Sequence, residues 1–256
     1  MRTPRLYLAA PLSVGEDIVL PQDTVHYLHQ VLRMKSGRKV WLFNGQGGEY
    51  LAEAVQLERR KGRLKVLEFV DVDRESPRPL RLEIALSKGD RFDWVIQKAT
   101  ELGVTDIQPL VTHYTDVRID NERLEKRMAH WQGIVRSASE QSGRTRLPQL
   151  YRPVVFDAHM EASCPAAGSV GPSLKYVLDP TGEQSLYRQL VSSTIAADST
   201  VRLLVGPEGG FSSAEIESAN RAGYQSVTLG PRVLRTETAP VAALAVVQSL
   251  CGDWQS

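Results

Sequence analysis

Two apolar runs in the last quarter of the chain each end in a turn of glycine and proline, and a helical pattern follows each turn. The first run, 201–205, precedes GPEGG at 206–210, and the second ends at Leu229 before GPR at 230–232. This succession is typical of an α/β sheet, in which ligands bind beyond the carboxyl ends of the strands. The turns lie about 24 residues apart, a usual βα repeat length. We therefore predict that adjacent strands bring both turns into one pocket.

The rest of the chain divides into two patterns. Residues 1–75 read as mostly β with one helix at about 21–34. The segment 73–79, DRESPRP, is charged and contains two prolines, as a domain boundary often does. Beyond it, strand and helix patterns alternate, which predicts a largely parallel sheet covered on both faces. Three helix starts are indicated: Asp90 and Asn121 as N-caps, and Ser212 with Glu215 as a capping box.

The last helical pattern, at about 236–250, has almost no polar face, because eight of its positions are Val, Ala or Leu between 241 and 250. A helix that is apolar all round must be buried on every side. The helix at the end of a chain of this size usually keeps one face in solvent. We therefore predict a homodimer through this helix, with complete burial inside one chain as the alternative.

The net charge of +1 hides an asymmetry between the two parts of the chain. Residues 1–152 carry 25 Lys and Arg against 20 Asp and Glu, and residues 153–256 carry 6 against 10. This favours polyanion contact by the first part, where the turn RMKSGRK at 33–39 is the densest basic cluster. A solvated helix end is the alternative interpretation of that turn.

The cysteines and apolar runs bear on the compartment. Cys164 and Cys251 lie far apart and form no CxxC pair, and the five histidines have no metal-binding spacing. The N-terminus is a poor signal peptide, and the longest apolar run is too short to cross a bilayer. We therefore expect a cytoplasmic protein without a metal.

The glycine turns also exclude some ligands. GxxxxGK[ST] is absent, and the charged residue of the first turn is Glu208, which would repel phosphates. A dinucleotide fingerprint belongs in the first βαβ unit, not near the end of the chain. A cationic or neutral cofactor with a heterocycle fits better, and S-adenosylmethionine is such a molecule.

The motifs resemble those of a known family. GPEGGFSSAE at 206–215 together with LGPRVLRTETA at 229–239 resembles the SPOUT methyltransferases, and more narrowly the bacterial family that methylates uridine N3 in 16S ribosomal RNA. Further matches are LSKGDRFDWVIQKATELGV at 86–104, SEQSGR at 139–144 and VLRMKSGRKVWLFNGQGGEY at 31–50. The resemblance spans almost the whole chain and is weakest at about 157–173, which reads as a variable loop.

The resemblance implies an α/β SPOUT catalytic domain with a C-terminal trefoil knot at 76–256 and a PUA-like RNA-binding β-barrel domain at 1–75. It also implies a homodimer formed through helices of the knot. S-adenosylmethionine would lie in the knot, held mainly by backbone. The positions that match the family's cofactor site are Leu178, Val205, Gly206, Glu208, Gly210, Leu229, Gly230, Val233, Leu234, Arg235, Thr236 and Ala239.

The implied reaction needs catalytic groups, because uracil N3 is a poor nucleophile until its imide proton leaves. Arg144 is our first candidate for holding the target phosphate or the developing imidate, with a surface arginine in a mobile loop as the alternative. Glu208 and Glu237 are both candidates for proton removal. Glu140 and Gln141 could hydrogen-bond the uracil edge or end their helix. The candidate RNA phosphate contacts are Arg2, Arg5, Arg33, Lys35, Arg38 and Lys39.

Two other functions are compatible with parts of the pattern. A non-enzymatic RNA-binding factor in ribosome assembly would use the barrel and the basic turn, with the knot as a scaffold. A nicotinamide-dependent oxidoreductase would use the glycine turns, but their position in the chain disfavours it.

Overall fold

The computed structural model describes residues 3–116, 121–163, 173–193, 195–196 and 198–255. The chain forms two compact units, of which the first comprises Met1–Glu75 with Ser139–Leu147 and the second comprises Ser76–Ala138 with Pro148–Ser256. The segment 139–147 falls in the range that the sequence assigned to the second domain, but it groups with the first unit.

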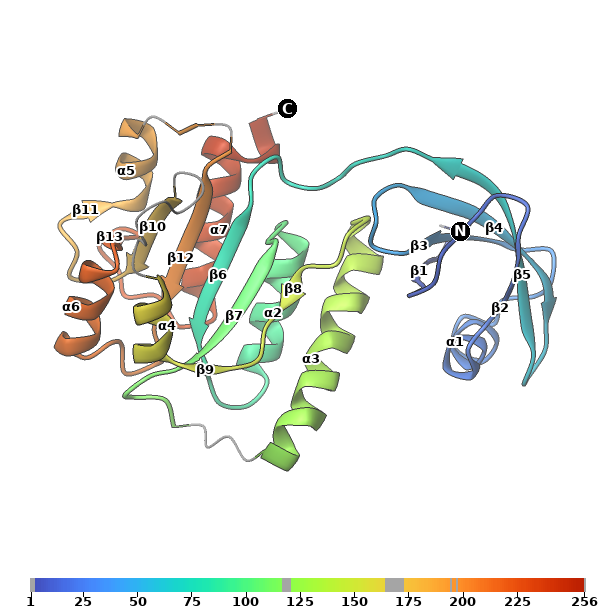
Figure 1. Ribbon diagram of the computed structural model, residues 1–256, viewed down its shortest axis with the longest axis horizontal. Helices are drawn as coiled ribbons and strands as arrows, with labels where there is room; N and C mark the ends of the chain where they lie inside the picture. The colour runs from blue at the N-terminus through green and yellow to red at the C-terminus, as the bar shows by residue number, and fades with distance from the viewer. Residues whose placement is uncertain (1–2, 117–120, 164–172, 194, 197, 256) are drawn as a thin grey trace. The chain divides into compact units, whose positions relative to one another are not determined.

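The first unit is built on a five-stranded sheet with the order β1-β3-β4-β5-β2 (Figure 1). β3 and β4 form a hairpin around 44–48, where Gly45, Gly47 and Gly48 have positive φ. β1 and β2 have only three residues each, too few to show the alternation that marks a strand in a sequence. The strands are β1 Arg5–Tyr7, β2 Asp17–Val19, β3 Lys39–Phe43, β4 Glu49–Leu57 and β5 Gly62–Val70.

The predicted helix of the first unit is two helices in succession. α1, Gln22–His26, continues directly into a π-helical segment η1, Tyr27–Val31. Arg33 has φ +50, and the Met34 amide donates to the Leu28 carbonyl at 2.9 Å. This left-handed residue ends the helix as a Schellman turn does, so that Met34 joins the core of the unit while the basic turn that follows is exposed.

Two arginines that pair with Glu49 attach the segment 139–147 to this unit. Glu49, 5% exposed, pairs with both Arg5 and Arg74. The same two arginines donate to carbonyls of the segment, Arg5 to Arg144 at 2.9 Å and Arg74 to Gly143 at 3.0 Å. The segment therefore completes the polar interior of the first unit, because these carbonyls and Glu49 satisfy the same two guanidinium groups.

The second unit contains an eight-stranded sheet in which every pair is parallel, as the alternating pattern predicts. The strand order is β11-β13-β10-β12-β6-β7-β8, and β9 pairs with β7 (Figure 1). The strands are β6 Leu80–Ala85, β7 Asp106–Val111, β8 Gln149–Leu150, β9 Val154–Val155, β10 Ser173–Leu178, β11 Gln184–Ser185, β12 Thr200–Val205 and β13 Gln225–Thr228.

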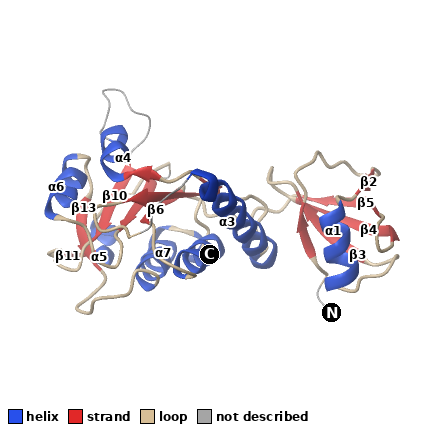
Figure 2. Ribbon diagram, turned by 90° about the horizontal axis from the view of Figure 1, so that it is seen from below, coloured by secondary structure: helices blue, strands red, loops and turns tan. Residues whose placement is uncertain are grey.

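Helices cover both faces of this sheet (Figure 2). α4 and α6 pack together on one face, and α5, α7 and α2 lie on the other. The helices are α2 Arg91–Glu101, α3 Asn121–Ser142, α4 Phe156–Ser163, α5 Leu186–Ser192, α6 Ser213–Arg221 and α7 Thr238–Cys251, followed by a 3-10 turn η2 Asp253–Gln255. No helix in the described part of the chain is long and apolar enough to cross a membrane.

Local sequence signals at helix starts had mixed outcomes. The Ser212–Glu215 capping box is present in full. Asp90 makes no side-chain cap, although its carbonyl accepts from the Trp94 amide at 3.0 Å. Asn121 is the first residue of α3, and its side chain lies outside the described residues. The region 157–173 is not all loop, because α4 covers its first part and buries Met160 in the core.

The strand order corrects one prediction about the glycine turns. β12 and β13, which precede the two turns, are not adjacent, because β10 pairs with both and lies between them. The chain therefore passes over β10 between the two motifs. The three carboxyl ends still meet at one edge of the sheet, because all three strands are parallel. The trefoil knot that the resemblance implies stays a prediction.

A buried polar cluster lies within the second unit at Glu83 of β6, whose side chain has no solvent exposure. Its carboxylate accepts hydrogen bonds from Arg202 Nε at 2.9 Å and from the Tyr224 hydroxyl. It also contacts His159 Nε2 at 3.1 Å. Burial alone would raise the pKa of Glu83, but the hydrogen bond to His159 and the charge of Arg202 hold that pKa below its ordinary value. The ion cluster therefore links β6, β12 and α4.

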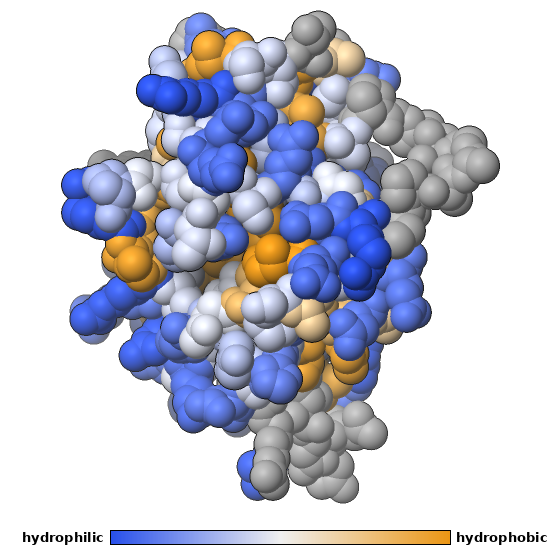
Figure 3. Space-filling model, turned by 90° about the vertical axis from the view of Figure 1, so that its left-hand side faces the viewer, coloured by the Kyte–Doolittle hydropathy of each residue, from blue (hydrophilic) through white to orange (hydrophobic). Residues whose placement is uncertain are grey.

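The last helix α7 buries one face and leaves the other half-covered. Pro240, Ala243, Leu244 and Val247 are buried. Val241, Ala242, Ala245 and Val246 are only partly buried. Nearby, α5 exposes Tyr187 and Val191, on the side of the molecule where apolar patches lie between hydrophilic residues (Figure 3). Complete burial within one chain, the alternative in the sequence analysis, therefore does not occur.

Candidate functional site

A cavity of about 950 Å³ lies at the carboxyl ends of β10, β12 and β13. Its walls are the loops that follow these three strands, at 178–181, 205–211 and 227–239. The structure brings together there every residue that the sequence analysis assigned to the cofactor, namely Leu178, Val205, Gly206, Glu208, Gly210, Leu229, Gly230, Val233, Leu234, Arg235, Thr236 and Ala239. Leu178 lies in the same cavity because it ends β10, the strand between β12 and β13.

The glycines of the loops serve two different needs. Gly210 has φ +72 and Gly230 has φ +103, a conformation that favours glycine. Gly206 has no positive φ, but a Cβ on it would lie 3.2 Å from the Phe211 ring. The Gly210 amide donates to the Pro207 carbonyl at 2.9 Å, which closes the 207–210 turn. The 207–210 turn is therefore held by its own backbone hydrogen bond.

Glu215 connects this loop to a turn that the sequence analysis did not single out. One carboxylate oxygen accepts from the Ser212 amide at 2.8 Å, and the other accepts from the His113 amide at 2.8 Å. The turn at 112–115, directly after β7, thereby lies beside the loop after β12. Nothing in the sequence connects residues so far apart, and only the pairing of β6 with both β7 and β12 brings them to the same sheet edge.

The charged groups of the cavity wall are partly paired. Arg91 Nη1 lies 2.6 Å from Glu208 Oε1, and both side chains are nearly half exposed. Arg91, which the sequence analysis did not single out, is the first residue of α2 and follows β6, the strand next to β12. Within the described residues, the Glu208 carboxylate contacts this guanidinium and not a backbone amide.

Glu237, the second candidate base, is the N-cap residue of α7 but caps no backbone amide with its side chain. Its carboxylate accepts from the Thr236 hydroxyl at 3.3 Å and lies 3.9 Å from Arg235 Nη1. The Glu237 side chain is 20% exposed. This carboxylate is therefore bound less closely to a cation than Glu208 is.

The wall combines these charges with an apolar surface. Leu178, Val205, Leu229 and Phe211 contribute apolar side chains. No group of three or more His, Cys, Asp or Glu in the described residues could hold a metal ion. The cavity therefore suits an organic ligand of mixed polarity, for which few convergent polar groups and an apolar lining are usual.

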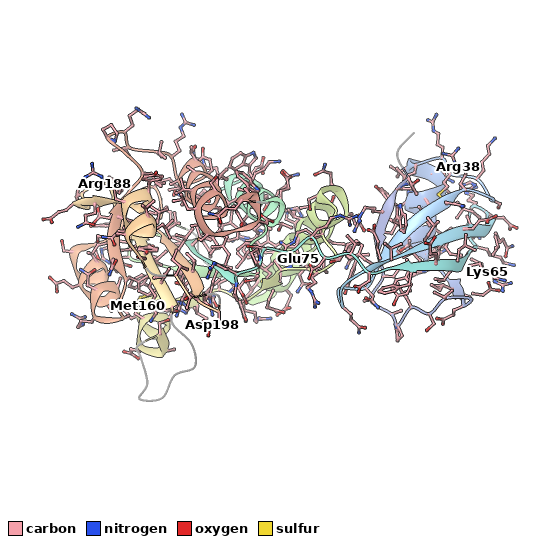
Figure 4. All side chains as sticks on the ribbon, turned by 90° about the horizontal axis from the view of Figure 1, so that it is seen from above. Arg38, Lys65, Glu75, Met160, Arg188 and Asp198 are labelled. Carbon is pink, nitrogen blue, oxygen red and sulfur yellow. The ribbon has the colours of Figure 1, made fainter. Side chains whose placement is uncertain are left out.

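The remaining predicted residues lie in the first unit, where they have different environments. Arg33, Lys35, Arg38 and Lys39 are exposed on the basic turn, and Arg38 extends outward from the edge of the unit (Figure 4). The guanidinium of Arg5 is buried and already paired with Glu49. Arg2 lies outside the described residues.

Arg144 is buried as well, with 4% of its surface exposed. Its Nε donates to Glu75 Oε2 at 3.0 Å, and the other Glu75 oxygen accepts from the amides of Thr145 and Arg146, each at 3.1 Å. The surface arginine in a mobile loop, the alternative in the sequence analysis, is therefore wrong. Glu140 accepts from the Tyr7 amide at 3.0 Å, so it also serves the interior of this unit.

Comparison with protein families matches both parts of the chain. An RNA methyltransferase domain matches residues 74–248, and an RNA methyltransferase PUA domain matches residues 20–67. These matches confirm the predicted combination of a PUA-like domain and a methyltransferase domain.

Individual relatives agree over the full length. The ribosomal RNA small subunit methyltransferase E of Synechocystis is 36% identical over 248 residues, which cover 96% of this chain and 77% of that protein. The crystal structure of the Neisseria gonorrhoeae protein of the same name, bound to S-adenosyl methionine, is 37% identical with a TM-score of 0.88, over 99% of this chain and 100% of that one. A Legionella pneumophila methyltransferase in complex with the cofactor SAM is 36% identical with a TM-score of 0.89, over 99% and 100%. The chain therefore belongs to the RNA methyltransferase family whose curated members are named ribosomal RNA small subunit methyltransferase E.

Proposed function

We propose that this protein transfers the methyl group of S-adenosylmethionine to N3 of a uridine in 16S ribosomal RNA of the small ribosomal subunit. The observation that carries the proposal is the convergence of three loops, remote in sequence, on one cavity that contains all twelve residues matching the family's cofactor site. The relatives solved with S-adenosylmethionine support the choice of cofactor.

The cavity fits S-adenosylmethionine in size and chemistry. Its volume of about 950 Å³ lies within the range of small-molecule pockets. Backbone groups of the turns at 206–210 and 229–236 can hydrogen-bond an adenine and an amino acid moiety, and the carboxylates of Glu208 and Glu237 favour a cation. When bound, the cofactor supplies an electrophilic methyl group on a sulfonium. Apolar side chains of the lining, such as Leu178 and Phe211, would exclude water from the bound cofactor.

The chain must remove or share the N3 proton of the uracil. Of the two candidate carboxylates, Glu208 is paired with Arg91 at 2.6 Å and is suited to hold the 206–210 loop. Among the described residues, Glu237 contacts the Thr236 hydroxyl and, at a longer distance, Arg235. We therefore assign proton acceptance to Glu237 and loop positioning to Glu208.

RNA contact is assigned to the basic turn of the first unit. Arg33, Lys35, Arg38 and Lys39 are exposed, and exposed cations on one turn can neutralise neighbouring phosphates. The burial of Arg5 against Glu49 makes it a supporting residue instead. The burial of Arg144 against Glu75 supports the same role for Arg144, so contact of its guanidinium with phosphate or imidate would first require release from Glu75.

We further propose that the protein acts as a homodimer through α7, in the cytoplasm, where small-subunit RNA is found. The half-covered residues Val241, Ala242, Ala245 and Val246 form an apolar stripe along α7 that a second copy would bury.

The test is incubation of the protein and labelled S-adenosylmethionine with small ribosomal subunits from cells that lack it, followed by mass mapping of the methylated nucleosides. A single 3-methyluridine in 16S RNA is expected. Calorimetry with S-adenosylmethionine separates the alternatives. Binding without turnover on any ribosomal particle would favour a non-enzymatic assembly factor, and absence of binding would reject the cofactor assignment.

A further inference from the structure

The turn at 112–115 is fixed at both ends. The Thr115 amide donates to the Thr112 carbonyl at 3.1 Å, and the Thr112 amide donates to Thr115 Oγ1 at 2.9 Å. Glu215 of α6 accepts from the His113 amide at 2.8 Å. The backbone of this turn therefore has a defined position at the carboxyl edge of the sheet.

Tyr114 lies at the tip of the turn and is 49% exposed. The ring of His113 meets the Tyr114 ring nearly at a right angle, with the centroids 4.6 Å apart, which is a favourable aromatic geometry. A lone exposed tyrosine is ordinary. Here, however, both the backbone and the ring are held while much of the ring surface stays open to solvent.

The position of Tyr114 is set by Gly209 of the cofactor cavity. A Cβ on Gly209 would come within 3.1 Å of Tyr114 Cβ and 3.3 Å of Tyr114 Cγ. Gly209 does not have positive φ, so space, not backbone conformation, is what a larger residue would lack. The loop that lines the cavity and the turn that presents Tyr114 are therefore in direct contact.

We propose that Tyr114 is the stacking platform for the target pyrimidine. This inference rests on the proposed function, because N3 lies on the pairing edge of uracil and the base must leave its helix to be methylated. Extruded bases are commonly held by stacking on aromatic side chains. A base stacked on a ring beside Gly209 keeps its edge, including N3, free to face the cavity. Stacking requires only a π face, so Tyr114 would hold the base without distinguishing which base it is.

The experiment compares Tyr114→Leu, Tyr114→Phe and Tyr187→Leu in methyl transfer to unmodified small subunits. Tyr187 is a matched control, because it is an exposed tyrosine of the same unit on α5. Loss of one stacked base is expected to lower kcat/KM by on the order of tenfold or more for Tyr114→Leu. Tyr114→Phe keeps the ring and is expected to stay within about twofold of wild type, as is Tyr187→Leu. Affinity for S-adenosylmethionine, measured by calorimetry, should be unchanged in all three.

Each other outcome is decisive. If Tyr114→Leu and Tyr187→Leu retain the same activity, the stacking role is wrong. If Tyr114→Leu weakens S-adenosylmethionine binding or changes the oligomeric state by as much as it lowers activity, Tyr114 supports the cavity loop or a subunit contact instead. A wild-type protein that binds S-adenosylmethionine but methylates no particle overturns the proposed function rather than the stacking geometry alone.

Discussion

Replacement of Glu83 by alanine should destabilise the second unit strongly. Glu83 has no exposed side-chain surface, and its partner Arg202 is only 13% exposed. Without the carboxylate, the guanidinium of Arg202 and the hydroxyl of Tyr224 stay buried and lose the acceptor they share. Breaking a buried ion pair in this way costs about 3–5 kcal/mol. For a domain of this size, that cost corresponds to a fall in Tm of roughly 6–20 °C.

The assay is urea unfolding followed by tryptophan fluorescence, with the m-value checked for constancy. The matched control is Glu125→Ala, because Glu125 forms an ion pair with Arg152 in the same unit but both side chains are more than half exposed. An exposed pair contributes about 0–1 kcal/mol. If Glu83→Ala costs no more than Glu125→Ala, the reasoning about the buried cluster is wrong.

Three further predictions concern the cavity, the basic turn and acid stability. Gly210→Ala should weaken S-adenosylmethionine binding measured by calorimetry. A residue with a side chain pays about 1–2 kcal/mol to adopt the φ of +72 found at Gly210, and the loop would relax to avoid that cost. Unchanged affinity would show that the loop tolerates a Cβ. Replacing both Arg33 and Lys35 by alanine should reduce the slope of log affinity for RNA against log salt by up to about two, and an unchanged slope would remove this turn from the interface. Burial alone would raise the pKa of Glu49, but the hydrogen bond from Arg74 and the charge of Arg5 hold it below the ordinary value of 4.5. The ionised Glu49 carboxylate therefore stabilises the folded protein fully above about pH 4.5, and this stabilisation is lost as the pH falls through the lower pKa of the folded state. The Tm difference between wild type and Glu49→Gln should therefore shrink on acidification.

The sequence predicted the fold class and the convergence of the glycine turns on one cavity, because both depend on local signals. Alternating apolar runs gave the parallel sheet, and the capping box at Ser212 gave the start of α6. The glycine turns placed the cavity at the carboxyl edge. These features follow from short stretches of chain that carry their own periodicity or turn chemistry.

Long-range features were not predictable in the same way. The pairing of β10 between β12 and β13 leaves no local trace, so the sequence suggested adjacent strands. The burial of Arg5 and Arg144 depends on carboxylates at Glu49 and Glu75, far away along the chain. Charged residues near the termini of elements read as surface residues unless a distant partner is known. Arg91 reaches the cavity, and Tyr114 reaches Gly209 in the cavity loop, only through the tertiary arrangement of the sheet edge.

The membership of residues 139–147 in the first unit means that the polypeptide leaves that unit, enters the second, comes back and departs again. Two domains joined by one linker can be exchanged between genes, but no single break in this chain separates these two units. A fragment ending at Glu75 would retain Arg5 and Arg74 without the Arg144 and Gly143 carbonyls that they bind in the whole chain. The two units should therefore be inherited together. Expression of residues 1–75 alone should yield aggregation-prone protein.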